Sequence, residues 1–244
     1  FHILNCKNLQ TMISLNKPPL DKCDLCLFKQ MVRQFVSEED FQLLYHSTIQ
    51  LKYKKGENIL KQGSQFSHII FLSKGIVKFN YENEFSKNFI LTIVNSPKLI
   101  GGINVFNDAT NMFSIVAIEE SVACLIDINV LKNLALKNSL LTMKLIEYAS
   151  STFKDSILNF ISLAHKQVNG RVADLIIYLS EKVYKEKDFA MTLTRKELAE
   201  FAGCSQENII HTLRRFHKEG VINTDGKRIK ILDFKRLLEI SKVG

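Results

Sequence analysis

The side chains with the most defined chemistry lie near the C-terminal end of the chain, in a segment with helical spacing. Gln206, Glu207 and His211 would share the outer side of one helix, and Arg214 and Arg215 follow one turn later. Amide, carboxylate and imidazole groups so placed can hydrogen-bond to the edges of bases, while guanidinium groups bind phosphate oxygens. This pattern indicates recognition of duplex DNA.

Two helices joined by a tight turn are needed to position these side chains. Thr194 and Glu197 have the spacing of a capping box, which predicts a helix over residues 195–202. The glycine after it permits a left-handed turn, and Ser205 is the expected cap of a second helix over residues 206–218. The residues expected on the inner side of this second helix are Ile209, Leu213 and Phe216.

Helix ends and positive charge would add contacts to phosphate. A helix N-terminus presents unpaired backbone amides, so we expect Thr194, Arg195 and Ser205 to lie near phosphate oxygens. Residues 166–244 hold 16 Lys and Arg against 11 Asp and Glu, and they thereby supply +5 of the formal net charge of +8. An acidic partner such as nucleic acid fits this excess.

A hairpin and a further helix complete this part of the chain. The helical spacing over residues 171–183 predicts a helix that would make the unit trihelical. Asp225-Gly226, between two short apolar runs, is a strong signal for a β-hairpin, which would form a wing. Residues 169–244 are therefore predicted to form a winged helix-turn-helix domain that binds DNA.

The rest of the chain divides into three parts. Residues 1–45 are expected to form a short N-terminal arm. Residues 46–128 contain short apolar runs separated by glycines, which is typical of a small antiparallel β-roll. Residues 129–168 change to a helical period and are expected to hold a long dimerisation helix and a hinge. The predicted fold class is α+β.

The long helix carries a narrow apolar stripe with steps of three and four residues. Such a stripe is not satisfied in an isolated helix, so pairing with a second copy of the chain is the favoured interpretation. Packing of the helix on its own β-roll is the alternative. The residues predicted at the dimer interface are Met143, Ile146, Phe153, Ile157 and Phe160.

These motifs, with several in the predicted roll, resemble the cyclic-AMP receptor protein and fumarate-nitrate reduction regulator (Crp/Fnr) family over roughly residues 20–240. The resemblance implies an N-terminal jelly roll like a cyclic-nucleotide-binding domain, a dimer helix, and a reader that holds a palindromic promoter site and contacts RNA polymerase. The matching segments are residues 55–63, 72–75, 117–124, 170–173 and 203–207.

The resemblance also bears on which bases are read. The family's base contacts correspond to Gln206, Glu207 and His211, and Glu207 matches the family's residue, whereas His211 stands where arginine is usual. Histidine does not reproduce the bidentate bond of arginine to guanine, which is worth about 1–3 kcal/mol of discrimination. We therefore expect a target related to, but different from, the family's usual TGTGA or TTGAT half-site.

The sensor segment departs from the cyclic-AMP binders, whose roll carries a Gly-Glu-Leu turn for the ribose and an Arg-Ser pair for the cyclic phosphate. Here residues 101–106 read Gly-Gly-Ile-Asn-Val-Phe, residues 111–115 read Asn-Met-Phe-Ser-Ile, and no arginine occurs between Arg33 and Arg171. Without a guanidinium, a buried phosphate would have only lysine and backbone donors. Cyclic AMP is therefore not the expected effector; a small hydrophobic or neutral ligand, or none, remains open.

Cysteines raise the possibility of an iron-sulfur cluster, as in the oxygen sensors of the family. Cys23 and Cys26 stand in the arm, and Cys124 matches the position of the fourth cluster ligand. However, the third arm cysteine of those sensors is replaced by Val32, and Cys6 lies upstream of the pair instead of downstream. A zinc or thiol-redox role and a purely structural role are the alternatives, and the structural one is favoured.

Other functions have weaker support. Haem would need an axial ligand such as His46 or His68, yet lone histidines near strands are usually ordinary surface residues.

An enzyme is not expected, because the sequence contains no catalytic triad spacing, no phosphate loop and no zinc-protease motif. No apolar run is long enough for a membrane span, and the odd cysteine count favours the reducing cytoplasm. A redox or cyclic-nucleotide-like sensor module without direct promoter binding is the alternative function.

Overall fold

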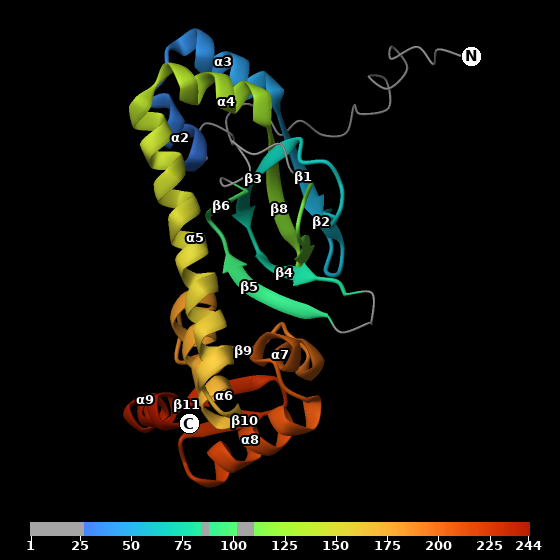
Figure 1. Cartoon of the computed structure of the whole chain (residues 1–244), viewed down its shortest axis with the longest axis vertical. Coiled ribbons are helices and arrows are strands. Elements are labelled where there is room, and N and C mark those ends of the chain that lie inside the picture. Colours follow the sequence, from blue (N-terminus) through green and yellow to red (C-terminus); the bar gives the residue numbers. More distant parts are fainter. Residues whose placement is uncertain (1–26, 84–87, 102–109) are drawn as a thin grey trace, which may run out of the picture.

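The computed structural model shows helices and strands in a clear order along the chain (Figure 1). The structure describes residues 27–83, 88–101 and 110–244. Strands come first, a long helix follows, and a small helical domain with a hairpin ends the chain. Among the described residues, no helix combines the length and the apolar character that crossing a membrane requires.

Two four-stranded antiparallel sheets form the predicted roll. The first has the order β1 (Thr48–Tyr53), β8 (Ser121–Asp127), β3 (His68–Lys74) and β6 (Lys98–Ile100). The second has the order β2 (Asn58–Leu60), β7 (Ser114–Ala117), β4 (Ile76–Tyr81) and β5 (Phe89–Asn95). Ile70 and Leu72 of the first sheet share one apolar cluster with Val77 and Ile115 of the second. The two sheets therefore enclose a common core, and the expectation of a roll is confirmed.

Three short helices cover one end of the roll. Two helices with a break between them, α2 (Leu27–Arg33) and α3 (Glu38–Ser47), precede the first strand. The break occurs because Ser37 caps α3 by accepting a hydrogen bond from the Asp40 N–H at 3.2 Å. Helix α4 (Ile128–Lys137) buries Leu131 and Leu134 in a cluster that also holds residues of β3 and β8.

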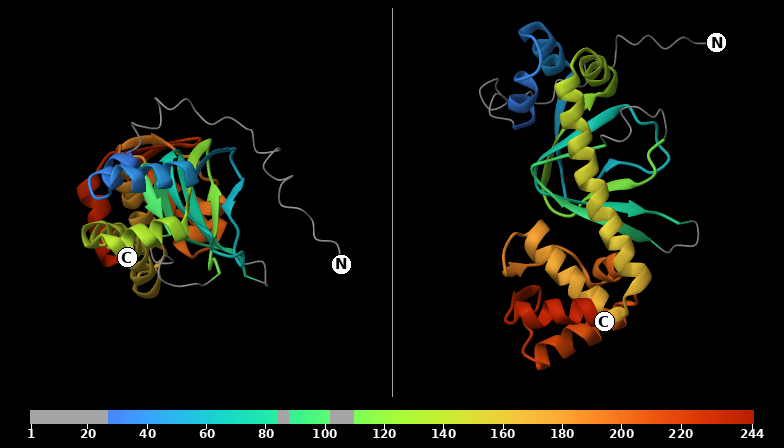
Figure 2. Two further views of the ribbon diagram at one scale, coloured as in Figure 1. Left: turned by 90° about the horizontal axis from the view of Figure 1, so that it is seen from above. Right: turned by 60° about the vertical axis from the view of Figure 1, so that its left-hand side comes forward.

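The long helix α5 (Ser139–His165) runs down one side of the roll to the C-terminal domain (Figures 1 and 2). It starts at Asn138, whose side chain accepts a hydrogen bond from the Leu141 N–H at 3.0 Å. Leu141 and Leu145 are buried against the roll, and Asn159 donates to the Leu91 carbonyl at 3.2 Å. One side of α5 is thus fixed on the roll, which leaves another side for a different partner.

The C-terminal domain contains the expected trihelical unit and hairpin, together with elements that the sequence did not reveal. Helix α9 and strand β9 were not predicted. Strand β9 adds a third strand to the hairpin, and α9 packs on α6, with Asp233 as its cap. The elements in chain order are α6 (Val168–Tyr178), η3 (Leu179–Val183), β9 (Asp188–Ala190), α7 (Arg195–Ala202), α8 (Gln206–Lys218), β10 (Ile222–Asp225), β11 (Arg228–Ile231) and α9 (Phe234–Val243).

The C-terminal domain is docked directly on the roll. Ile90 and Ile93 of β5 belong to the same apolar cluster as Leu198 of α7. The Tyr178 hydroxyl donates to the Ile93 carbonyl at 2.7 Å, and burial raises the pKa of Tyr178 to about 12. Lys55 Nζ also donates to the Thr192 carbonyl at 2.7 Å. Apolar and polar contacts together therefore define the arrangement of the two domains.

Candidate DNA-binding surface and sensor cavity

The helix-turn-helix is formed by α7 and α8, at the bounds that the sequence predicted. The Thr194 hydroxyl accepts from the Glu197 N–H at 3.2 Å, and the Glu197 carboxylate accepts from the Thr194 N–H at 2.7 Å. Gly203 follows with a φ of +58°, a conformation that favours glycine. Ser205 then caps α8 by accepting from the Asn208 N–H at 3.2 Å. Local hydrogen bonds thus determine where both helices begin.

The two sides of α8 differ sharply in burial. Ile209, Leu213 and Phe216 are at most 3% exposed and form the inner side. The outer side carries amide, carboxylate, imidazole and guanidinium groups on consecutive turns, which suits base edges and phosphates. The exposed residues of α8 are Gln206, Glu207, Asn208, His211, Arg214, His217 and Lys218. Asn208 was not among the predicted contacts, although its place in the first turn beside Glu207 would have indicated it.

Two of the predicted contacts on α8 already have partners in the free protein. Hydrogen bonds from its own backbone N–H and from the Ser205 hydroxyl lower the pKa of the Glu207 carboxyl, so this group is held charged at the start of α8. Arg215 is only partly exposed, and its Nε lies 3.5 Å from a carboxylate oxygen of Glu219. Arg214, by contrast, is exposed and better placed than Arg215 to meet a phosphate.

Arg195, which was expected to lie near phosphate, has a contact with the wing in this structure. Its Nη2 donates to the Gly226 carbonyl in the hairpin turn at 3.0 Å, and its Nη1 is buried without a hydrogen-bond partner among the described residues. Burial lowers the pKa of this guanidinium. Arg195 therefore connects α7 to the wing, and Thr194, although exposed, is engaged with Glu197.

The start of α7 is also bound to the roll. Lys78 on β4 forms an ion pair with Glu197 at 2.9 Å, and the two side chains are only 13% and 16% exposed. Burial alone would raise the pKa of Glu197, but the hydrogen bonds from Thr194 and Lys78 and the charge of Lys78 hold it below its ordinary value. Glu197 therefore serves both as the capping residue of α7 and as its anchor to the roll.

The wing presents basic side chains beside the recognition helix. Strands β10 and β11 pair in antiparallel register, and Lys227, Arg228 and Lys230 are exposed on them and their turn. Arg228 is partly neutralised because its Nε donates to Asp188 at 2.6 Å. His217 of α8 accepts from the Thr224 N–H at 3.1 Å, which joins the helix to the wing. Helix and wing are thus joined by a hydrogen bond, and both carry exposed basic side chains.

The predicted dimer stripe of α5 is exposed in the single chain. The fractional exposures along it are 63% for Met143, 46% for Ile146, 55% for Phe153, 41% for Ile157 and 65% for Phe160. On the same helix Leu141 and Leu145 are at most 1% exposed, so the five residues are far more accessible than the roll-facing leucines. We call the five residues the α5 stripe.

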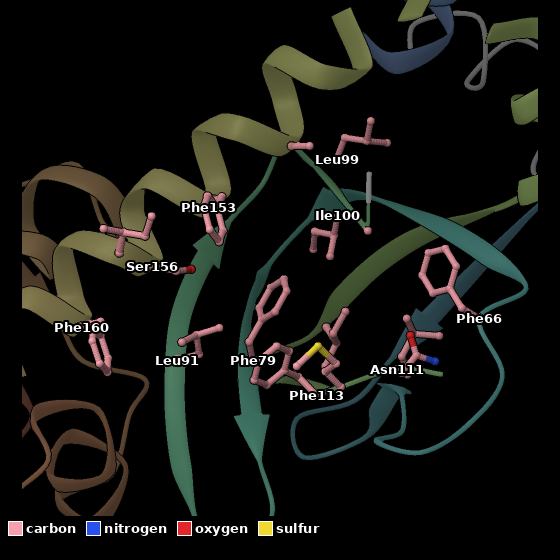
Figure 3. A pocket seen from close by; sticks show the side chains of 16 residues that line it. Phe66, Phe79, Leu91, Leu99, Ile100, Asn111, Phe113, Phe153, Ser156 and Phe160 are labelled. Carbon is pink, nitrogen blue, oxygen red and sulfur yellow. The ribbon is translucent and has the colours of Figure 1, made fainter. Parts of the chain in front are cut away.

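A cavity of about 470 Å³ lies between the roll and α5 (Figure 3). Its lining from the roll is largely apolar, and α5 supplies a further wall. Phe153, Ile157 and Phe160 belong both to this wall and to the α5 stripe. The lining residues are Leu60, Phe66, Phe79, Leu91, Leu99, Ile100, Gly101, Asn111, Met112, Phe113, Ile115, Ala149, Phe153, Ser156, Ile157 and Phe160.

Comparisons with known proteins match both halves of this arrangement. Residues 50–138 match the model of the cyclic nucleotide-binding domain, and residues 170–240 match the Crp-like helix-turn-helix domain. The anaerobic regulatory protein of Haemophilus influenzae is 25% identical over 90% of this chain and 87% of its own length. The fumarate and nitrate reduction regulatory protein of Vibrio cholerae is 24% identical over 91% of each chain. The structure of FixK2 from Bradyrhizobium japonicum has a TM-score of 0.73 at 16% identity, and covers 81% of this chain and 98% of that one.

The chain belongs to the Crp/Fnr family. It is a DNA-binding transcription regulator with a sensor roll ahead of a winged helix-turn-helix reader. The likeness to FixK2 concerns the fold alone. The family resemblance inferred from the sequence motifs is therefore confirmed, as is the α+β architecture.

The candidate cofactor residues are not gathered into a site in the described part of the chain. Cys124 on β8 is 2% exposed, accepts a hydrogen bond from Gln50 at 3.6 Å, and lies in the apolar cluster that holds Phe28. Cys6, Cys23 and Cys26 lie outside the described residues. No group of three or more His, Cys, Asp or Glu residues that could hold a metal ion occurs within residues 27–83, 88–101 and 110–244.

The two histidines considered for haem lie away from the cavity. His46 is exposed on the last turn of α3, where its ring meets Tyr45 edge to face. The Nδ1 of His68, on β3, is 2.8 Å from the Ser67 hydroxyl. Neither residue lines the cavity. The apolar cavity is therefore the candidate ligand site that the described residues offer.

Proposed function

We propose that the chain acts as a homodimer that binds a two-fold symmetric site in duplex DNA, under the control of an effector other than cyclic AMP. The observation that carries the proposal is α8, which buries an apolar side and exposes Gln206, Glu207 and His211 together with Arg214. Such a helix can enter the major groove, while the wing and Ser205 contact phosphates. Arg195 would support this surface through the wing.

The α5 stripe supports the dimer. Its five residues follow the three- and four-residue steps of a coiled-coil seam, in which the polar Ser150 takes the step between Ile146 and Phe153, and the five are exposed in the single chain. A pair of such helices related by two-fold symmetry would bring together two readers. Recognition helices about 34 Å apart would then meet successive major grooves on one side of the duplex, which requires a palindromic site.

The remaining parts of the proposal follow from this role. The division into arm (1–45), roll (46–128), dimer helix with hinge (129–168) and reader (169–244) describes the working units. We infer that the regulator acts in the cytoplasm, contacts RNA polymerase when it is bound at a promoter, and performs no catalysis.

The effector is proposed to differ from cyclic AMP because the cavity has no cation to pair with a cyclic phosphate. Among the described residues that line it, none is charged. A cluster on Cys23, Cys26 and Cys124 is the second candidate. Anaerobic purification followed by an absorption spectrum and iron analysis distinguishes a small organic effector from a bound cofactor. The absorption bands of an iron-sulfur cluster, or the Soret band of haem, would show that a cofactor is the sensing group.

In vitro selection of DNA from a random pool tests the reader. We expect a palindrome whose half-site differs from TGTGA and TTGAT, with an affinity that falls steeply as salt is added. In the variant His211→Arg, the selected sequence should gain a guanine at one position, because arginine binds guanine O6 and N7 together. Lys218→Arg is the matched control and should select the wild-type sequence.

Two outcomes would contradict these proposals separately. Recovery of either standard half-site by the wild-type protein would show that His211 does not change the preference. A pool without enrichment, together with binding that does not respond to salt, would reject DNA binding by this surface.

A further inference from the structure

We propose that the cavity between the roll and α5 binds an uncharged, largely apolar ligand with an aromatic or alicyclic body. The inference rests on the proposed function, since it names the class of effector that the dimer would sense. It is carried by the chemistry of the cavity wall, by the size of the cavity and by the place of the cavity next to the α5 stripe (Figure 3).

The wall selects against charge. Five phenylalanines line the cavity, and the other lining residues are aliphatic or small apart from Asn111, Met112 and Ser156. An anion taken from water into such a site would lose its hydration without gaining an ion pair, whereas an apolar molecule would gain from burial. Aromatic rings also favour edge-to-face and offset contacts with other rings. The wall phenylalanines are Phe66, Phe79, Phe113, Phe153 and Phe160.

The size and the few polar groups fit one small organic molecule. A volume of about 470 Å³ lies within the range of sites that bury most of a drug-sized ligand. Asn111 is fixed at the wall because its Nδ2 donates to the Ser64 carbonyl at 3.2 Å and to the Ser64 hydroxyl at 3.0 Å. Asn111 and Ser156 are then the groups that would orient a hydroxyl, carbonyl or ring nitrogen of the ligand.

The cavity is also connected to the proposed dimer interface. Phe153, Ile157 and Phe160 line the cavity and belong to the α5 stripe. A ligand that contacts their inner sides would change how their outer sides meet a second copy of α5. Because the same helix leads directly to the reader, occupancy of the cavity would bias the spacing of the two recognition helices.

The test uses the full-length protein and N-phenyl-1-naphthylamine, an uncharged aromatic molecule that fluoresces in apolar surroundings. We expect saturable binding of one molecule per chain that excess cyclic AMP does not displace. Ala149→Phe inserts a side chain into the cavity from α5 and should weaken binding at least about tenfold, which corresponds to about 1.4 kcal/mol. Ala149→Leu should act in the same direction with a smaller change in volume.

Leu158→Phe is the matched control, because it adds an aromatic ring to the exposed part of the same helix without lining the cavity. It should bind the probe like the wild type. Displacement of the probe by cyclic AMP, or equal binding by wild type and Ala149→Phe, would overturn the proposal. Absence of probe binding by a well-folded dimer would also overturn it, since side chains of a second copy would then fill the cavity. DNA selection on the same samples separates this failure from a failure of the proposed function.

Discussion

The sensor half and the reader half of the molecule differ in what they present to their surroundings. Large exposed apolar side chains in the described residues occur almost entirely before the reader, and Leu232 is the single one within it. The reader instead exposes amide, carboxylate, imidazole and guanidinium groups over α8 and the wing. A face that is apolar is adapted to a second copy or an apolar ligand, whereas a polar and basic face is adapted to DNA.

The two halves also differ in the surroundings of their aromatic side chains. The reader buries Phe201 and Phe216 fully, while the roll leaves a cavity of about 470 Å³ beside α5. A filled core maintains a fixed surface, and an open one can respond to a ligand. The comparison therefore suggests that recognition is rigid in the reader and adjustable in the sensor.

Phe216→Ala is the variant with the largest expected effect, because it tests the filled core. Phe216 is 0% exposed, and its removal should lower the free energy of unfolding of the reader by about 3–5 kcal/mol. Phe79→Ala, at the cavity wall and partly exposed, should cost less than half as much. Urea unfolding followed by circular dichroism measures both, and equal losses would contradict the difference in packing.

The sequence revealed the reader better than the sensor because the reader's signals are local. Thr194, Glu197 and Ser205 determine the starts of α7 and α8 through bonds to residues three positions away. The start of α3 follows the same rule, because the Ser37 side chain accepts from the Asp40 N–H. Helix α9 was missed although its cap, Asp233, makes an equally local bond to the Arg236 N–H.

Features that depend on distant contacts were not accessible from the sequence. The contact of Arg195 with the wing is one of them, because it joins the guanidinium to the Gly226 carbonyl, 31 positions along the chain. The cavity likewise arises only where Phe79, Phe113 and Phe153 from separate elements meet. The apolar spacing of α5 indicated the stripe, yet not that part of it also lines a cavity.

The double variant Phe153→Glu/Ile157→Glu tests the apolar face of the sensor half. Placing carboxylates in the α5 stripe would require burial of unpaired charges on association, so the dissociation constant of the dimer should rise at least about 100-fold, or about 2.8 kcal/mol. Sedimentation equilibrium measures the change. Leu158→Glu, outside the stripe, should leave the dimer intact. A double variant that remains dimeric would show that the interface lies elsewhere.

Lys78→Met tests the contact between the two halves. It removes the cation that is 2.9 Å from Glu197, so a charge-assisted hydrogen bond worth about 1–3 kcal/mol is lost. The bonds of Glu197 to Thr194 remain, and α7 should therefore stay helical while it separates more often from β5. Hydrogen exchange of the α7 and β5 amides should speed up, whereas Lys52→Met on exposed β1 should have no effect there. Unchanged exchange in Lys78→Met would mean that the apolar contacts alone hold the domains together.

Arg214→Ala is expected to have the smallest effect and isolates the electrostatic part of the reader's surface. One phosphate contact fewer should weaken binding to all DNA sequences alike and reduce the slope of log affinity against log salt by about 1. Glu207→Ala should behave oppositely: the slope stays nearly constant, while discrimination at one base pair falls by about 1–3 kcal/mol. Fluorescence anisotropy over a salt series, on the selected site and on a scrambled one, separates the two responses. If Arg214→Ala changed the preference between these sites but not the slope, Arg214 would contact bases, and the division of α8 into a base-reading start and a phosphate-binding end would be wrong.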